Sequence, residues 1–126
     1  MYIRFESTLP DTDARCCSGV FTAAFDIWYD RADLTSLWQV QEMRRVLDWF
    51  NEHLKKPEHF YYRPNRKAEI SGICWFHASA HSHVSQARYL AWLLNDIGQP
   101  IVTRTASAPG RVLWQDNHQV VAAQTL

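Results

Sequence analysis

Apolar residues spaced three and four positions apart run through residues 33–55. Side chains at this spacing share one face of an α-helix, so the segment is expected to be an amphipathic helix with that face in the core. Asp33 is a suitable N-cap, and Pro57 would end the helix. The expected buried face consists of Leu37, Val40, Met43, Leu47, Phe50 and Leu54, widened by Trp38 and Trp49.

The same spacing predicts a second helix over residues 79–97. Ser79 is a suitable cap, Gly98 stands where a left-handed residue ends many helices, and Pro100 prevents continuation. The expected buried stripe is Val84, Ala87, Ala91, Leu94 and Ile97. Residues 20–29 also show helical spacing; their valine, threonine and phenylalanine residues suit a strand as well, and a short helix is the favoured interpretation.

Five segments have the character of β-strands. Residues 2–6 alternate, with Ile3 and Phe5 on one face and Arg4 and Glu6 on the other, which is the pattern of a half-buried strand. The other four strands are expected at 70–76, 101–105, 111–115 and 118–123, the last two joined as a β-hairpin by a turn at Asp116 and Asn117.

The elements follow one another in the order β-α-α-β-α-β-β-β, and the chain of 126 residues suits a single domain, 1–126. This order predicts an α+β fold with one mixed sheet of about five strands and two or three helices packed on one face. Residues 70–105 form a strand-helix-strand unit. If its strands are parallel neighbours, the connection is right-handed, and both strands end at one edge with the start of the helix between them.

The sequence CWFHASAHSH, residues 74–83, runs from the end of the first of these strands to the start of the helix, at that edge of the sheet. It is the most chemically distinctive part of the chain. A helix start offers free amide N–H groups and a partial positive charge, which suit a phosphate or carboxylate when hydroxyl and guanidinium groups lie nearby. The sequence therefore predicts an anion-binding edge formed by His77, Ser79, Ser82, Arg104, Ser107 and Arg111. The alternative is that Ser79 only caps the helix and that the arginines are solvated.

A metal or thiol site in the same stretch is a second alternative. Cys74, His77 and His81 carry atoms that bind zinc, and a thiolate beside a histidine is a nucleophile. However, residues three apart in a regular strand point to opposite faces, and no residue is a clear third member of a catalytic triad. The favoured expectation is therefore a site without a metal or a cofactor.

Charge restricts the expected classes of partner, and cysteine content restricts the expected location. Thirteen basic side chains balance thirteen acidic ones, so no overall field favours nucleic acid or an acidic membrane. The segment FYYRPNRK, residues 60–67, is a local cluster of basic and aromatic residues that could stack on bases, or could simply pin a loop to the core. Three cysteines, two of them adjacent, make a poor disulfide framework, and neither a signal segment nor a membrane-length apolar run is evident, so a cytoplasmic location is expected.

These observations predict a small cytoplasmic binding or regulatory domain rather than an enzyme. It would recognise a protein partner or a small anionic ligand such as phosphate or a nucleotide, without general binding to nucleic acid or membranes. A homodimer formed through the edge of the terminal hairpin is a further expectation. The alternative function is a metal- or thiol-dependent enzyme of the hydrolase type that uses Cys74, His77 and His81.

Overall fold

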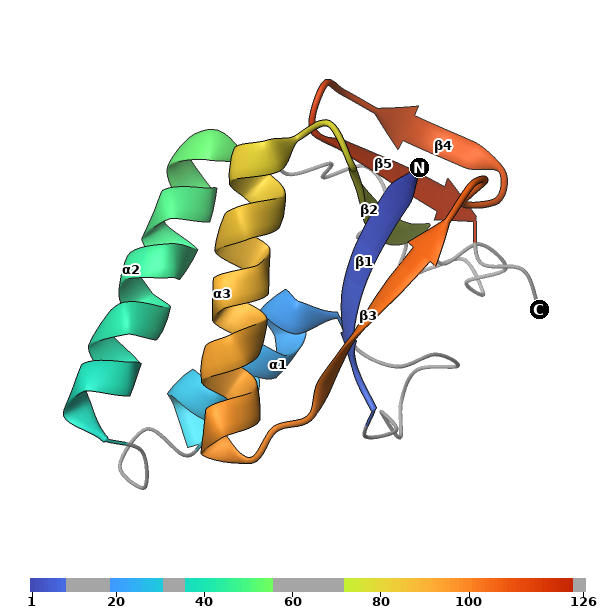
Figure 1. Ribbon diagram of the computed structural model, residues 1–126. Coiled ribbons are helices and arrows are strands. Elements are labelled where there is room, and N and C mark those ends of the chain that lie inside the picture. Colours follow the sequence, from blue (N-terminus) through green and yellow to red (C-terminus); the bar gives the residue numbers. More distant parts are fainter. Residues whose placement is uncertain (9–18, 31–35, 56–71, 124–126) are drawn as a thin grey trace, which may run out of the picture.

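The computed structural model describes residues 1–8, 19–30, 36–55 and 72–123 of the chain (Figure 1). Within them lie three helices, α1 (Val20–Asp30), α2 (Leu37–His53) and α3 (His81–Ile97), and five strands, β1 (Tyr2–Ser7), β2 (Gly72–His77), β3 (Ile101–Ala106), β4 (Val112–Gln115) and β5 (Gln119–Ala123). The expected α+β class, the single sheet and the order of elements are confirmed, and residues 20–29 are helical.

In the described part of the chain, all strand pairings are antiparallel, in the order β3-β1-β2-β5-β4, so the sheet is antiparallel and not mixed as expected. β1 pairs with β3 along its whole length and with β2 only through Tyr2 and Ile3. Because β1 is antiparallel to both neighbours, β2 and β3 run in the same direction, but the expectation that they are neighbours is wrong. Handedness restricts how a strand-helix-strand unit crosses over, and it does not prevent another strand from lying between its two strands.

The three helices cover one face of the sheet, and the core lies between the two layers (Figure 1). β1 shows the expected alternation, since Phe5 is buried in this core while Arg4 and Glu6 lie on the opposite face. The stripe on α3 is buried as expected, except that Ile97 packs only partly buried against the core. The core's largest fully buried side chains are Ile27, Met43, Val46, Leu90, Leu93 and Leu94.

The start of α2 differs from the expectation. Ser36 is the N-cap and Leu37 the first helical residue, whereas the expected cap, Asp33, lies outside the described residues. The middle of the stripe is buried as predicted, but Leu37 is 72% exposed and Trp38 is 50% exposed. The expectation that these two side chains join the buried face is wrong, because the first turn of α2 lies at the outer margin of the helix layer, away from the sheet (Figure 1).

Both ends of α3 depend on the backbone rather than on a side-chain cap. The helix begins at His81 after Ala80, and the prediction that Ser79 caps it is wrong, because no side chain makes a capping hydrogen bond there. At the other end Gly98 adopts the expected left-handed conformation, with φ of 99°. Its N–H group and that of Gln99 donate to carbonyls of the last helical turn at 3.1 and 2.8 Å, which terminates α3 as predicted.

The predicted hairpin is present as β4 and β5, and its turn is organised by one carboxylate. Oδ1 of Asp116 accepts the backbone N–H groups of His118 and Gln119 at 2.8 and 2.9 Å. This is the side-chain-to-backbone bonding that favours aspartate in tight turns. The predicted basic and aromatic segment at 60–67 lies outside the described residues.

Candidate functional site

The predicted anion-binding edge is the end of the sheet at which β2 and β3 finish. Tyr2, the first residue of β1, lies directly opposite His77 of β2 and Ala106 of β3. The backbone N–H of Ala78 donates to the carbonyl of Met1 at 3.1 Å. The start of β1 therefore occupies the space between the two strand ends.

The residues predicted for this edge fall into three groups. His77, Ser79 and Ser82 remain together, at the end of β2, in the following loop and on the first turn of α3. Arg104 and Ser107 lie on the far side of β1, at the end of β3. Arg111 stands apart from both groups, just before β4.

The two predicted cations are placed differently from the expectation. Arg104 donates its Nε–H to Oε1 of Glu6 at 2.9 Å. The carbonyl of Arg111 accepts the N–H of Ala123 at 2.7 Å, and Ala123 pairs with Gly72, the first residue of β2. The length of β2 thus separates Arg111 from the predicted edge, so the six residues are not gathered around one space.

The alternative site at Cys74 is divided by the alternation of β2. Phe76 faces the core, so Cys74, two residues earlier, lies on the same face, and His77 lies on the other. The ring of His77 packs against that of Tyr2, with 5.3 Å between centroids, and its Nε2 lies 3.0 Å from the carbonyl oxygen of Asp116. Among the described residues, no three histidine, cysteine or acidic side chains are placed to hold a metal ion.

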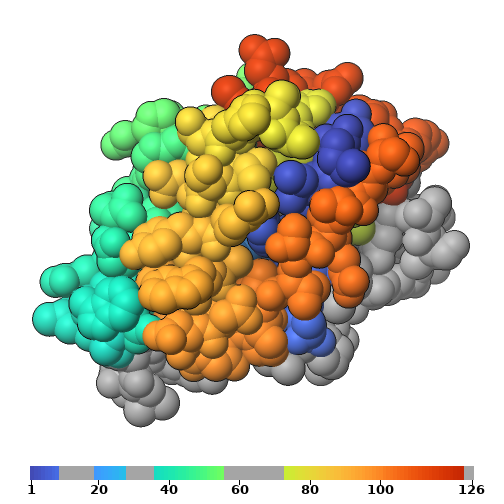
Figure 2. Space-filling model, in the orientation of Figure 1, coloured from blue at the N-terminus to red at the C-terminus, as the bar shows by residue number. Residues whose placement is uncertain are grey.

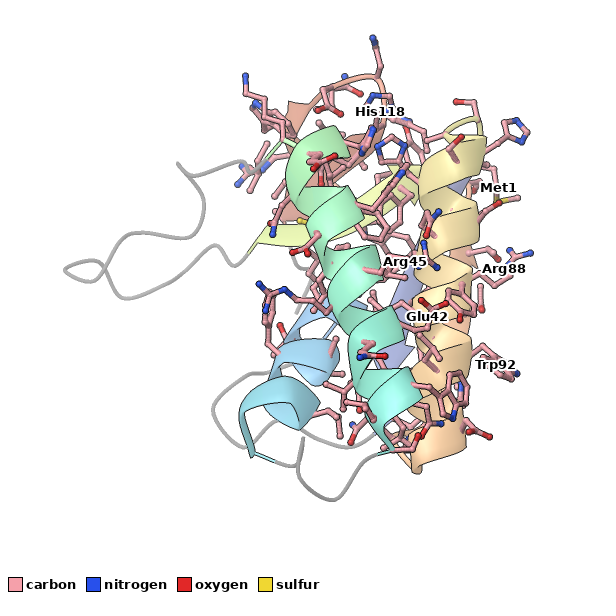
Figure 3. The ribbon with its side chains drawn as sticks, turned by 90° about the vertical axis from the view of Figure 1, so that its left-hand side faces the viewer. Met1, Glu42, Arg45, Arg88, Trp92 and His118 are labelled. Carbon is pink, nitrogen blue, oxygen red and sulfur yellow. The ribbon has the colours of Figure 1, made fainter. Side chains whose placement is uncertain are left out.

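The structure brings together a group of rings that sequence reasoning did not find. This group, here called the histidine junction, is a continuous chain of ring contacts formed by Trp49 and His53 on α2, His83 on α3 and His118 in the hairpin turn. His53 stacks on Trp49 with centroids 4.4 Å apart, and Trp49 meets His83 edge-on at 4.9 Å. His83 in turn stacks on His118 at 4.1 Å, with an interplanar angle of 20°. Three elements therefore meet through these four rings, where α2 ends and α3 begins (Figure 3).

Hydrogen bonds fix the histidine junction to the backbone. His83 is 6% exposed, and its Nε2–H donates to the carbonyl of His53 at 2.8 Å. The side chain of Gln119 donates to the carbonyl of Lys55, which ties the hairpin to the residues that follow α2. Burial lowers the pKa of His83 below its usual 6.5, and the neighbouring His118 and His53 lower it further, against the hydrogen bond to His53 and the charge of Asp116, which raise it. His83 is consequently held as neutral imidazole at neutral pH.

A second feature lies on the outside of the paired helices α2 and α3. Trp38 on α2 and Trp92 on α3 are 50% and 53% exposed, and the ring of Tyr89 stacks 6.0 Å from that of Trp92. These three rings are here called the aromatic face. α2 and α3 are antiparallel and lie side by side in Figure 2, and Tyr89 contacts Glu42. Trp38 is one turn before Glu42, and Trp92 is one turn after Tyr89. Because the two helices are antiparallel, both indoles are displaced from that contact toward the same end of the helix pair.

Charged groups hold Tyr89 in place. Its hydroxyl donates to Oε1 of Glu42 at 2.7 Å, while Nε of Arg45 donates to Oε2 of the same carboxylate at 2.8 Å. The guanidinium of Arg45 also lies over the Tyr89 ring, 5.6 Å from its centroid. The hydrogen bonds from Arg45 and then Tyr89 lower the pKa of Glu42, and the bond to Glu42 raises the pKa of Tyr89. Glu42 is therefore a carboxylate and Tyr89 a phenol throughout the physiological range.

Sequence reasoning missed the aromatic face for an identifiable reason. Trp38 was assigned to the edge of a buried stripe, although it is also four residues before Glu42 on a polar side of the helix. Trp92 lies outside the apolar stripe predicted for α3, and Arg88, Asn95 and Asp96 share its side of the helix, which is a usable signal for an exposed indole. The histidine junction carried no comparable signal, because its rings come from three segments that are 30 or more residues apart.

No protein-family model, curated protein or solved structure matches this chain. Across the described residues, the helices lack the length and apolar character needed to cross a bilayer. The functional argument therefore depends on the geometry of the chain's own surfaces.

Proposed function

We propose that the chain is a non-catalytic interaction domain that binds a partner protein through the aromatic face on α2 and α3. The observation that carries the proposal is the exposure of two tryptophans, each about half exposed, on adjacent turns of paired helices. Tryptophan, tyrosine and arginine are the residues that most often dominate protein-binding energies, and an exposed cluster of large apolar side chains marks such surfaces.

The prior ordering of Tyr89 supports this proposal. Glu42 and Arg45 hold the ring from two sides before any partner arrives. A partner that packs on Tyr89 and Trp92 therefore loses less conformational entropy than it would on mobile side chains. Figure 3 shows Glu42 and Arg45 on the α2 side of this surface and Arg88 and Trp92 projecting outward from α3.

The charged side chains near the aromatic face indicate what chemistry a partner should have. Glu42 is bound by Arg45 and Tyr89, and Asp96 accepts a hydrogen bond from Gln39. Within the described segments, no carboxylate forms an ion pair with Arg88, which is exposed one turn from Trp92. Of the two charges one turn from Trp92, Asp96 is occupied by the amide of Gln39 and Arg88 is available, so the proposed partner presents an apolar side chain next to an aspartate or glutamate that pairs with Arg88.

The small anionic ligand expected from the sequence has weaker support. His77, Ser79 and Ser82 remain near the start of α3, but Arg104 is paired with Glu6 and Arg111 lies at the other end of β2. The enzymatic alternative has less, because Cys74 and His77 face opposite sides of the sheet. Titration with inorganic phosphate, followed through the amide signals of Ser79 and Ser82, tests the first of these directly.

The aromatic face can be tested with a photoreactive amino acid. A benzophenone side chain placed at Trp92 is expected to crosslink one partner in cells that express the protein, whereas the same group at Arg44, which is exposed on α2 beside Asp48, is not. The purified partner is then titrated against Trp92→Ala, which should weaken binding at least about tenfold, or about 1.4 kcal/mol. Because the side chain is half exposed, stability should change by no more than about 0.5 kcal/mol.

A second substitution tests whether the charge of Arg88 contributes to binding. Arg88→Glu should weaken the same complex, and this loss should shrink as salt is added, because an exposed ionic contact is screened. Unchanged affinity in Trp92→Ala, or equal crosslinking at both positions, contradicts the proposal. A partner whose bound surface is basic contradicts the assignment of its chemistry, and a crosslink to a second copy would identify a homodimer instead.

A further inference from the structure

The histidine junction joins three elements that are far apart in the chain. α2 contributes His53, α3 contributes His83, and the turn between β4 and β5 contributes His118. The rings of His83 and His118 are nearly parallel at 4.1 Å, so they are in face-to-face contact. Such contact between imidazoles is compatible with neutral rings, and two positive charges at this separation repel each other.

The groups that surround His83 do not offset a charge there. His53 faces it from α2, and His118 and Asp116 face it from the hairpin turn. Asp116 is the one acid among them, and its Oδ1 already accepts the backbone N–H groups of His118 and Gln119. The carboxylate is therefore committed to the turn, and although it favours a protonated His83, this effect is smaller than that of burial and the two histidines, which favour the neutral ring.

We propose that the histidine junction is a pH-sensitive latch, which holds the hairpin turn against α2 and α3 while the stacked ring of His83 is neutral and releases the turn when His83 is protonated. The contacts that open are the stack of His118 on His83 and the hydrogen bond from Gln119 to the carbonyl of Lys55. The turn's own hydrogen bonds to Asp116, and the bond from His77 to the carbonyl of His118, loosen with them. The pairing of β5 with β2 is independent of these rings and remains.

The direction of the pH effect follows from which state of the junction, open or closed, binds the proton on His83 more tightly. The unfolded or opened chain binds the proton with the ordinary histidine pKa, whereas the closed junction lowers the pKa of His83 below 6.5. The closed state is thus fully favoured above pH 6.5 and loses stability as the pH falls below it. Each pH unit that separates the two pKa values changes the ratio of open to closed by about tenfold on acidification.

Amide hydrogen exchange measured at about pH 7.5 and about pH 5.5, corrected for intrinsic exchange rates, tests the latch. The informative amides are those of His77, His118 and Gln119, which donate to the carbonyl of His118 or to Asp116 in the closed turn. Protection of these amides is expected to fall at the lower pH, while amides of the β1–β3 pair keep theirs. Equal loss in β1 and β3 would show global acid unfolding instead and would overturn the proposal.

Matched substitutions test whether His83 and His118 are the residues responsible for the pH effect. His118→Phe keeps a stacked ring that cannot be charged and should preserve protection at about pH 5.5, and His83→Gln, which keeps an N–H donor toward the carbonyl of His53, should do the same. His81→Gln removes an exposed histidine from the same turn of α3 and should behave like the unsubstituted protein. The proposal is overturned if the unsubstituted protein keeps full protection, or if both junction variants that fold lose it as the unsubstituted protein does.

Discussion

Two glycines show how a single residue can be required by the backbone alone. Gly98 at the end of α3 and Gly110 before β4 have φ angles of 99° and 108°, which side chains with a Cβ atom rarely adopt. The surroundings differ, because a Cβ at Gly98 would meet no atom within 4 Å, whereas one at Gly110 would lie 3.0 Å from the carbonyl oxygen of Ala123. The sequence identified Gly98 because it follows a helical stripe directly and precedes Pro100.

We expect Gly98→Ala to lower the free energy of unfolding by about 1 kcal/mol, the cost of the left-handed conformation. Gly110→Ala should cost more, since strain is added to a close contact with the backbone. Urea denaturation measures both values. Gly98→Asn serves as the control, because asparagine tolerates this conformation and should lose less. Equal stability of Gly98→Ala and the unsubstituted protein would contradict the backbone argument.

At the scale of elements, Glu6 links β1 to β3 on the face of the sheet opposite the helices. Its carboxylate accepts hydrogen bonds from Arg4 at 3.0 Å and from Arg104 at 2.9 Å, although Glu6 and Arg104 are 98 residues apart. The side chain of Glu6 is 17% exposed, so water competes weakly for these bonds. By contrast, both side chains of the Arg44–Asp48 pair on α2 are more than half exposed.

Glu6→Gln should therefore destabilise the protein by about 1–2 kcal/mol, because two charge-assisted hydrogen bonds are weakened at a partly buried site. Asp48→Asn is the matched control and should change stability by less than about 0.5 kcal/mol. Urea denaturation at low and high salt distinguishes the two substitutions, since salt should abolish the stabilising contribution of the exposed pair only. Equal effects of the two substitutions would show that Glu6 acts no differently from a surface charge.

Most elements could be predicted from the sequence because their signals are local. Three- and four-residue spacing identified α2 and α3, alternation identified β1, and the turn at Asp116 identified the hairpin. Where local chemistry was ambiguous the prediction failed: Ser79 looks like a helix cap, yet α3 begins only at His81. The exposed Trp38 was likewise misplaced, because periodicity gives the phase of a helix and not how far the core extends along it.

At the scale of the whole molecule, strand order could not be predicted, and the candidate site changed with it. The sequence indicated that β2 and β3 end at one edge, and they do, but β1 lies between them. Nothing in the alternation of β1 specifies which strands it pairs with, since either of its edges can accept a neighbour. The stack of His83 on His118 was inaccessible for the same reason, because it exists only once α3 and the hairpin have been placed.

The position of β1 between β3 and β2 leads to a prediction for truncation. A chain that lacks residues 1–7 should not unfold cooperatively, because β3 would lose its partner and the sheet would be divided. Near-UV circular dichroism and a thermal scan detect this loss. Phe5→Ala is the graded variant: Phe5 is 2% exposed in the core, so the substitution should cost about 3–5 kcal/mol. Native packing and a sharp transition in the shortened chain would contradict a central role for β1.

The same strand constrains how the protein is made. Glu6 and Arg104 are 98 residues apart in the chain, so β1 leaves the ribosome on the order of ten seconds before its neighbour β3 is synthesised. During that interval the edge of β1 that pairs with β3 is open, and the nascent chain is exposed to misassociation and open to chaperones. Slowing translation should therefore bring no early folding of the sheet and should only prolong the vulnerable period.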